Sequence, residues 1–264
     1  MKTIGEIRKT IVCNMIKKRT FTQLLLMAGL LFAAVTACDK SEDPGGDSPS
    51  ARTVKDADGN VYNTVKIGTQ VWMVENLRTT KYNDGSPIPN VTDKETWANL
   101  KTDAYCNYAN LESNAEIYGR LYNWFSVNTG KLAPAGWHVP TEDDWTILEN
   151  YLIANGYNYD GTLDEDKIAK AICAKTNWAS SSEAGTPGAS PENNNSTGFT
   201  ALPCGYRDNH FGTFYDIGKY GNWWSSAEND ENYAYFRRLG YNYLDLCRNL
   251  NSKGYGFSVR LVRD

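Results

Sequence analysis

Residues 134–154 read PAGWHVPTEDDWTILENYLIA, and this stretch decides how the rest of the chain is interpreted. Thr141 follows a proline and is a favourable N-cap, with Asp144 at the capping-box position and acidic residues in the first turn. Apolar residues then recur at helical spacing. The stretch predicts a helix from Thr141 to Ala154 whose buried stripe consists of Trp145, Leu148, Leu152 and Ile153.

Short strands are predicted on the N-terminal side of this helix. Residues 61–67 and 71–74 are rich in β-formers and are separated by Gly68-Thr69, which suggests two strands joined by a tight turn. Asp58-Gly59-Asn60 is typical of another turn. Apolar residues over 117–125 recur every three to four positions and predict an amphipathic helix.

The C-terminal side returns to strands. A weaker helix is predicted over 164–175, and the Ser-, Gly-, Pro- and Asn-rich residues 179–197 predict a long surface loop. Five short β-rich runs follow, over 199–207, 222–227, 233–239, 243–249 and 255–262. Strands, then helices, then strands indicate a segregated α+β fold with short strands and two to three helices.

The first residues have the pattern of a targeting segment. Lys17-Lys18-Arg19 precede a short apolar run that ends in Val35-Thr36-Ala37-Cys38. A basic region followed by an apolar region of this length is typical of a signal peptide, predicted over 1–37. Small residues before Cys38 resemble the lipobox of bacterial lipoproteins, in which the cysteine becomes the lipidated N-terminus. A plain secretory signal is the alternative.

A polar tether is predicted to follow the lipidation site. Residues 38–53 contain Pro, Gly, Ser and acids but nothing that could build a core. Three acids close to Cys38 resemble a surface-export tag, with a simple solvated linker as the alternative. We therefore expect an outer-membrane lipoprotein whose folded domain spans 54–264.

Composition excludes several functional classes. The 264 residues carry 27 Lys/Arg and 31 Asp/Glu, and six of those bases lie within 1–37 with one acid. The remainder is therefore strongly acidic, which argues against nucleic-acid binding. Two histidines are too few for a His-rich zinc site. Aromatic residues reach 12%, a level that suits sugar or protein contacts.

Six strings in a fixed order identify a family resemblance. They are DGNVY (58–62), IGTQVWMVENL (67–77), YGRLYNW (118–124), PAGWHVPT (134–141), WSS (224–226) and GFSVR (256–260). In this order they resemble the Fibrobacter succinogenes major paralogous domain family, whose members are typically secreted or lipid-anchored bacterial proteins of poorly defined function.

Two of these segments, GWHVPT (136–141) with the following Trp145, and the terminal GFSVR (256–260), are also similar to the formylglycine-generating-enzyme branch of the C-type-lectin-like fold. That resemblance implies that the helix at 141–154 packs on a mixed sheet holding both ends of the domain. Family members often carry cysteines where this chain has Ala133 and Leu261, so the resemblance implies that an apolar pair replaces a disulfide here.

Four cysteines fall within the domain, and they allow three pairings. Cys204–Cys247 is favoured because both lie in the late strand region, with Cys106–Cys173 by elimination; buried thiols are the alternative. The enzymes named above use a copper-binding cysteine pair, but the residues around Cys204 do not reproduce their motif. His138 is expected to be a packed, hydrogen-bonded residue, and no catalytic residue is assigned.

Binding residues are expected among late aromatic and acidic positions. Glu228, Asp230 and Glu231 cluster oxygen ligands suited to calcium, although solvated hairpin ends have the same composition. Strand alternation predicts that one of Trp223 and Trp224 points inward and the other outward. The candidate ligand-binding residues are Trp223, Trp224, Tyr206, Tyr220 and Tyr233.

These features together predict a non-catalytic binding domain held at the membrane by its lipid anchor. Its expected ligand is a glycan or a protein, with no cofactor other than an optional calcium ion. An enzyme distantly related to the formylglycine-generating group and a structural envelope protein are the alternatives.

Overall fold

The computed structural model describes residues 53–264, so the predicted signal peptide, Cys38 and all of the tether before Thr53 lie outside the described residues. Its elements are β1 (Thr53–Lys55), β2 (Val61–Ile67), β3 (Gln70–Met73), α2 (Lys94–Ala98), β4 (Tyr105–Cys106), η1 (Tyr108–Asn110), α3 (Glu112–Tyr118), β5 (Leu121–Tyr122), α4 (Trp124–Asn128), α5 (Glu142–Ala154), α6 (Ala169–Ile172), η2 (Pro191–Asn193), β6 (Cys204–Arg207), β7 (Phe214–Ile217), β8 (Tyr220–Glu228), β9 (Tyr233–Gly240), β10 (Cys247–Ser252) and β11 (Val262–Arg263). The α+β class is confirmed, with more strand than helix.

Helix α5 forms as its capping residues predict. The Thr141 hydroxyl accepts the Asp144 backbone N–H at 3.1 Å, and the Asp144 carboxylate accepts the Thr141 backbone N–H at 2.8 Å. This capping box satisfies two backbone donors that a helix start leaves unpaired. Trp145, Leu148 and Leu152 are fully buried, which confirms most of the predicted stripe.

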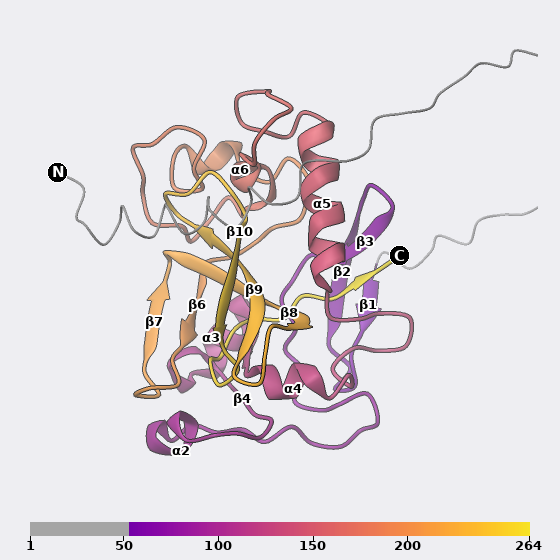
Figure 1. Ribbon diagram of the computed structural model, residues 1–264, viewed down its shortest axis with the longest axis vertical. Helices are drawn as coiled ribbons and strands as arrows, with labels where there is room; N and C mark the ends of the chain where they lie inside the picture. Colours follow the sequence, from indigo (N-terminus) through magenta and orange to yellow (C-terminus); the bar gives the residue numbers. More distant parts are fainter. Residues whose placement is uncertain (1–52) are drawn as a thin grey trace, which may run out of the picture. The chain divides into compact units, whose positions relative to one another are not determined.

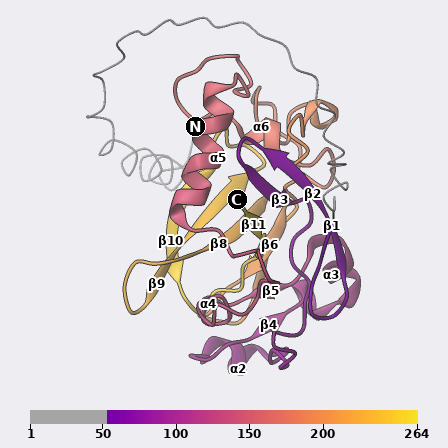
Figure 2. The same cartoon turned by 90° about the vertical axis from the view of Figure 1, so that its right-hand side faces the viewer.

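Both ends of the domain meet in one sheet. Its strand order is β1-β2-β3-β11, and every pairing is antiparallel, so the implied mixed sheet is wrong. Helix α5 packs on this sheet through Trp145, whose ring centroid lies 4.8 Å from that of Trp72 on β3. Figures 1 and 2 show α5 standing beside the β1–β3 strands and the β8–β10 strands.

The second sheet has the antiparallel order β10-β9-β8. Arg237 on β9 is almost fully buried, and it joins this sheet to α5 by ion pairs to Glu142 at 3.0 Å and Glu149 at 2.9 Å. Arg248 on β10 adds an ion pair to Glu142 and stacks on the Tyr235 ring at 3.9 Å. Helix α5 is therefore held on one side by aromatic packing and on the other by charge.

The helix predicted over 117–125 is wrong. The segment contains the end of α3, strand β5 and the start of α4. Gly119 ends α3 with φ of +76°, and a Cβ there would lie 2.6 Å from the Asn76 Cβ. The close approach of this turn to residues 76 and 77 breaks the helix, since only glycine combines that conformation with that contact.

Other predicted boundaries need correction. The helix predicted over 164–175 reduces to α6, and the strand predicted over 255–262 reduces to β11 with isolated bridges before it. Strand β7 was not predicted. Residues 179–197 contain only the short η2, which confirms the predicted loop. Within residues 53–264, five α-helices replace the expected two or three, and only α5 among these exceeds seven residues.

Candidate functional site

Both predicted tryptophans are buried, so neither can contact a ligand at the surface. Trp223 lies in the core cluster beneath α5, whereas Trp224 lies in a second cluster with Phe236 and Phe257. The alternation that points them to opposite faces of β8 is therefore confirmed. The expectation that one is exposed is wrong, because packed side chains cover both faces of β8.

Tyr206 and Tyr220, by contrast, lie with three further tyrosines, Tyr215, Tyr243 and Tyr255, whose rings are also accessible. Tyr206 stacks with Tyr215 at 5.7 Å and with Tyr255 at 5.9 Å between ring centroids. Tyr220 stacks with Tyr243 at 5.8 Å. All five rings are at least partly exposed. We call this group, together with Arg238, the tyrosine surface.

Arg238 occupies the middle of the tyrosine surface. Its guanidinium carbon lies 5.1 Å from the Tyr220 ring centroid, and its Nε donates to the Asn222 side-chain oxygen at 2.8 Å. The Asn222 amide nitrogen donates in turn to the Gly205 carbonyl at 3.2 Å, which ties β8 to β6. The arrangement is therefore fixed by hydrogen bonds before any ligand arrives.

Three hydroxyls of this surface, those of Tyr206, Tyr243 and Tyr255, have raised pKa values and stay protonated at physiological pH. Burial raises the pKa of Tyr206 to about 12, reinforced by the nearby Asp216 charge and opposed by Arg238. Burial also raises the pKa of Tyr255 and of Tyr243. The surface thus offers uncharged rings with neutral hydroxyls that both donate and accept hydrogen bonds.

Tyr233 does not belong to this surface. It is 48% exposed at the start of β9, and strand alternation places it on the same face as Arg237, the face that α5 covers further along. The structure therefore separates Tyr233 from Tyr206 and Tyr220.

The acidic residues proposed for calcium lie at the turn between β8 and β9. Glu228 pairs with Lys253 at 2.8 Å, and one Asp230 oxygen accepts the backbone N–H groups of Asn232 and Tyr233. Glu231 is exposed. Within residues 53–264, no group of three or more His, Cys, Asp or Glu side chains is placed to hold a metal ion. Calcium binding stays a prediction.

The predicted disulfides are not formed. Cys106, Cys173, Cys204 and Cys247 are all buried thiols. Strand β10 lies two strand spacings from β8, roughly 10 Å, and β6 packs against β8, so Cys204 is out of reach of Cys247. Cys204 instead contacts the Ser258 hydroxyl at 3.1 Å, and Cys247 contacts the Asp245 carboxylate at 3.3 Å. Cys106 and Cys173 belong to different core clusters.

Three of the four described thiols and both histidines have defined surroundings. Burial raises the pKa of Cys106 and of Cys173 to about 12 and also raises that of Cys204, whereas a nucleophilic cysteine needs a lowered pKa. His138 is hydrogen-bonded to Asp144 at 3.0 Å, as expected for a structural residue. His210 is exposed and contacts the Tyr255 ring edge-on.

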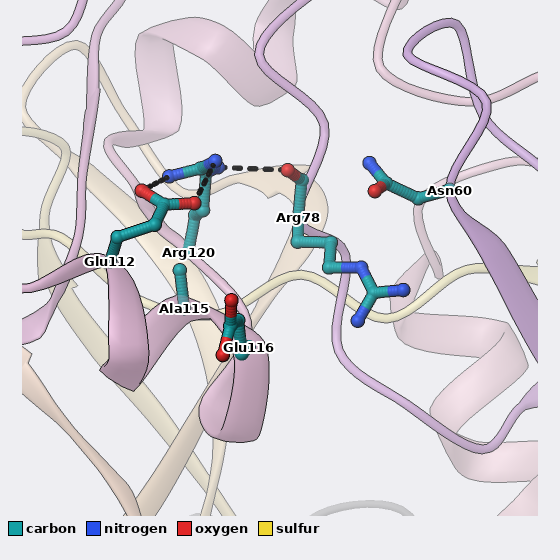
Figure 3. A pocket seen from close by; sticks show the side chains of 6 residues that line it. All are labelled: Asn60, Arg78, Glu112, Ala115, Glu116 and Arg120. Atoms are coloured by element: carbon teal, nitrogen blue, oxygen red, sulfur yellow. Dashed lines mark hydrogen bonds and ion pairs between the residues drawn. The ribbon is translucent and has the colours of Figure 1, made fainter.

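A cavity of about 480 Å³ lies away from the residues that were predicted for binding. Its lining residues are Asn60, Arg78, Glu112, Ala115, Glu116 and Arg120 (Figure 3). We call it the Arg78 cavity. Its volume falls within the range of small-molecule sites, roughly 300–1,000 Å³.

Three segments distant in sequence build this cavity. Asn60 comes from the turn before β2, which is held by hydrogen bonds from Asn60 to the Asp56 carboxylate. Arg78 follows β3, and its backbone N–H donates to the Tyr62 hydroxyl at 2.9 Å. The remaining residues come from α3 and the turn that ends it, where Gly119 allows Arg120 to approach.

Arg120 is fully engaged within the cavity wall. It donates to both Glu112 carboxylate oxygens, at 2.8 and 3.1 Å, and to the Arg78 carbonyl at 2.8 Å. The Arg120 charge holds the pKa of Glu112 below its usual range through these hydrogen bonds. Sequence reasoning missed this pair, because residues 112 and 120 flank the helix break that was itself not predicted.

Comparison with known proteins gives one match. No curated protein and no solved structure matches the chain. No helix within residues 53–264 is long and apolar enough to cross a membrane. The model of the Fibrobacter succinogenes major domain family matches residues 65–263, which is most of the chain and nearly all of the described domain. The chain therefore belongs to the Fibrobacter succinogenes major domain family.

Proposed function

We propose that this protein is a non-catalytic glycan-binding lipoprotein whose binding face is the tyrosine surface. One observation carries the proposal: five partly exposed tyrosine rings from β6, β7, β8 and two later loops stack in two groups, Tyr206 with Tyr215 and Tyr255, and Tyr220 with Tyr243, and Arg238 lies against the second group. Flat rings with polar tips suit sugars, which present both apolar and hydroxyl faces.

Glycine at position 240 supports this arrangement of rings. A Cβ there would lie 2.8 Å from the Tyr243 ring and 3.0 Å from the Tyr220 ring. The two rings therefore occupy space that any other residue would fill, and their orientation is set by the backbone. Rings held in place lose little conformational freedom when a ligand binds.

A non-catalytic role fits the described side chains. The buried thiols have raised pKa values, and His138 is committed to the helix cap through Asp144. We also propose a C-type-lectin-like fold, supported by the sheet that joins both ends of the domain and by the packing of α5 on it.

The glycan proposal is tested by a glycan array probed with the protein, once with calcium and once with chelator. Binding that survives chelation and is lost in Tyr220→Ala and Tyr255→Ala supports the tyrosine surface. Tyr233→Ala is the matched control, because Tyr233 is even more exposed than Tyr220 and Tyr255 but lies elsewhere. Binding lost in chelator would point to the acidic turn instead, and a blank array would overturn the proposal.

The lipid anchor is a separate part of the proposal. It is supported by Val35-Thr36-Ala37-Cys38 and the polar segment after it. Labelled fatty acid supplied to cells that express the protein should be incorporated and should be absent from Cys38→Ser. Equal labelling of both proteins, or none, would overturn the anchor without affecting the glycan proposal.

A further inference from the structure

We propose that the Arg78 cavity is a second binding site, which takes the carboxylate of a uronic acid residue in an acidic glycan. This inference rests on the proposed glycan-binding function, but on different residues. The Arg78 cavity shares no residue with the tyrosine surface.

The first step is the state of the Arg78 side chain. Its Nε is enclosed by protein atoms and has no hydrogen-bond partner among residues 53–264. The guanidinium carbon lies 5.5 Å from the Tyr62 ring centroid, and the side chain makes no ion pair with any described carboxylate. Figure 3 shows this guanidinium directed away from Glu112 and Arg120. The terminal guanidinium nitrogens of Arg78 also form no hydrogen bond or ion pair among residues 53–264, and they are the donors that a carboxylate entering the cavity would meet.

The second step is the charge of the cavity. Glu112 neutralises Arg120, which leaves Arg78 and the exposed Glu116 as the groups with no such partner. The lining therefore carries one cation that is available and one carboxylate beside it. Arg78 can therefore accept one singly charged carboxylate group, whereas a phosphate dianion would bring a second negative charge beside the unpaired Glu116.

The third step is the polarity of the remaining lining. Asn60 and Glu116 offer an amide and a carboxylate for hydrogen bonds to hydroxyl groups, and Ala115 is the one apolar residue among the six. A peptide carboxylate would bring an apolar side chain that finds little surface here. A sugar acid matches better, since it combines one carboxylate with several hydroxyls.

The test is calorimetric titration of the protein with trigalacturonate and with its methyl ester, in chelator. The two probes share every hydroxyl, and esterification removes the charge of each carboxylate at the cost of one added methyl group. We expect the acid to bind about tenfold or more tightly than the ester, the effect of a hydrogen-bonded charge. Arg78→Gln should abolish the difference, and Arg78→Lys should retain part of it. Arg263→Gln, a substitution outside the cavity, should leave it unchanged.

Three results would overturn the inference: equal affinity for acid and ester, a difference that survives in Arg78→Gln, and no binding of either probe. Thermal unfolding of each variant shows whether it is folded, and the comparison of acid with ester needs no variant at all. Failure here is distinguishable from failure of the proposed function. The proposed function is tested by binding of neutral glycans on the array and by its loss in Tyr220→Ala, and neither result depends on Arg78.

Discussion

The guanidinium of Arg260 is fully buried and donates to the side-chain oxygen of Asn76 at 2.9 Å. The same oxygen accepts the Trp223 indole N–H at 2.8 Å, and further Arg260 donors reach the backbone carbonyls of Phe199 and Thr200. No described carboxylate forms an ion pair with Arg260, and burial lowers its pKa to about 9. One amide oxygen therefore replaces the counter-ion that a buried cation normally requires.

Replacing this amide should destabilise the whole domain. Asn76→Ala leaves Arg260 and the Trp223 indole without their shared acceptor, so we expect a loss of about 2–4 kcal/mol in the free energy of unfolding. Urea unfolding measures it. The exposed Asn193→Ala should change the same quantity by less than about 0.5 kcal/mol. If Asn76→Ala lowers the free energy of unfolding by as little as Asn193→Ala does, Arg260 must find other hydrogen-bond acceptors in that variant.

Arg237 should matter far more than a surface base. Arg237→Met leaves Glu142 and Glu149 facing each other without their buried cation, and we expect a loss of about 3 kcal/mol. Adding Glu142→Gln and Glu149→Gln should recover part of it. Lys131→Met removes an exposed ion pair with Asp84 and should cost at most about 1 kcal/mol in urea unfolding. Similar losses for both single variants would contradict this account.

The Asp144 cap should make stability depend on acidity. Burial alone would raise the pKa of Asp144, but hydrogen bonds from Thr141 and His138 together outweigh it and lower the pKa below its usual value. A lowered carboxyl pKa contributes stability above its unfolded value, near 4, and that contribution is lost as pH falls through the folded value.

Asp144→Asn should therefore be about 0.5–2 kcal/mol less stable than the native protein at neutral pH. This difference in the free energy of unfolding should become smaller as pH is lowered toward about 3, because protonation of Asp144 then removes the helix cap from the native protein as well. Unfolding curves across this range measure the difference. Asp143→Asn, an exposed control in the first turn of the helix, should have nearly the same free energy of unfolding as the native protein. A difference for Asp144→Asn that does not change with pH would contradict this account.

The four thiols should be unreactive in the folded protein. Burial keeps Cys106, Cys173 and Cys204 protonated, and Cys247 is only 4% exposed. Alkylation followed by peptide mass spectrometry should label all four after unfolding without reductant, and none before. A cysteine that is labelled in the unfolded protein only after reduction would contradict this prediction, because it would have to be part of a disulfide.

Ala133 and Leu261 belong to the same buried cluster, which agrees with an apolar pair in place of the disulfide that the family resemblance implies. Ala133→Cys combined with Leu261→Cys should oxidise to a disulfide and stabilise the domain by about 2–4 kcal/mol against its reduced form. Each single cysteine should form no bond. If the double variant does not form a disulfide, Ala133 and Leu261 do not occupy the positions of the cysteine pair that the family resemblance implies.

Local signals predicted the elements that local chemistry controls. The capping box of α5 and the turn at Gly68-Thr69 need only neighbouring residues, and both were predictable. The helix predicted over 117–125 failed because the contact of Gly119 with Asn76 is distant in sequence. Apolar periodicity indicates which residues are buried. It does not indicate which distant backbone segment will lie in contact with a given residue.

In the candidate sites too, residue types could be predicted from local sequence, whereas the grouping of distant residues could not. Tyr206 and Tyr220 were predictable as aromatic positions near strand ends, but their grouping with Tyr243 and Arg238 depends on how strands pack. Arg78 had no sequence signal, since a single arginine after a strand is common. What distinguishes Arg78 is the absence of a described partner for its Nε, and that follows from the complete fold.

The sheet β1-β2-β3-β11 also constrains how the protein is made. Strands β1, β2 and β3 leave the ribosome early, whereas β11, which pairs with β3, is the last strand of the domain to be synthesised. Until then one edge of β3 is open and the surface that α5 covers is incomplete. The edge of β3 is therefore paired, and this sheet completed, only after the chain has been synthesised as far as β11.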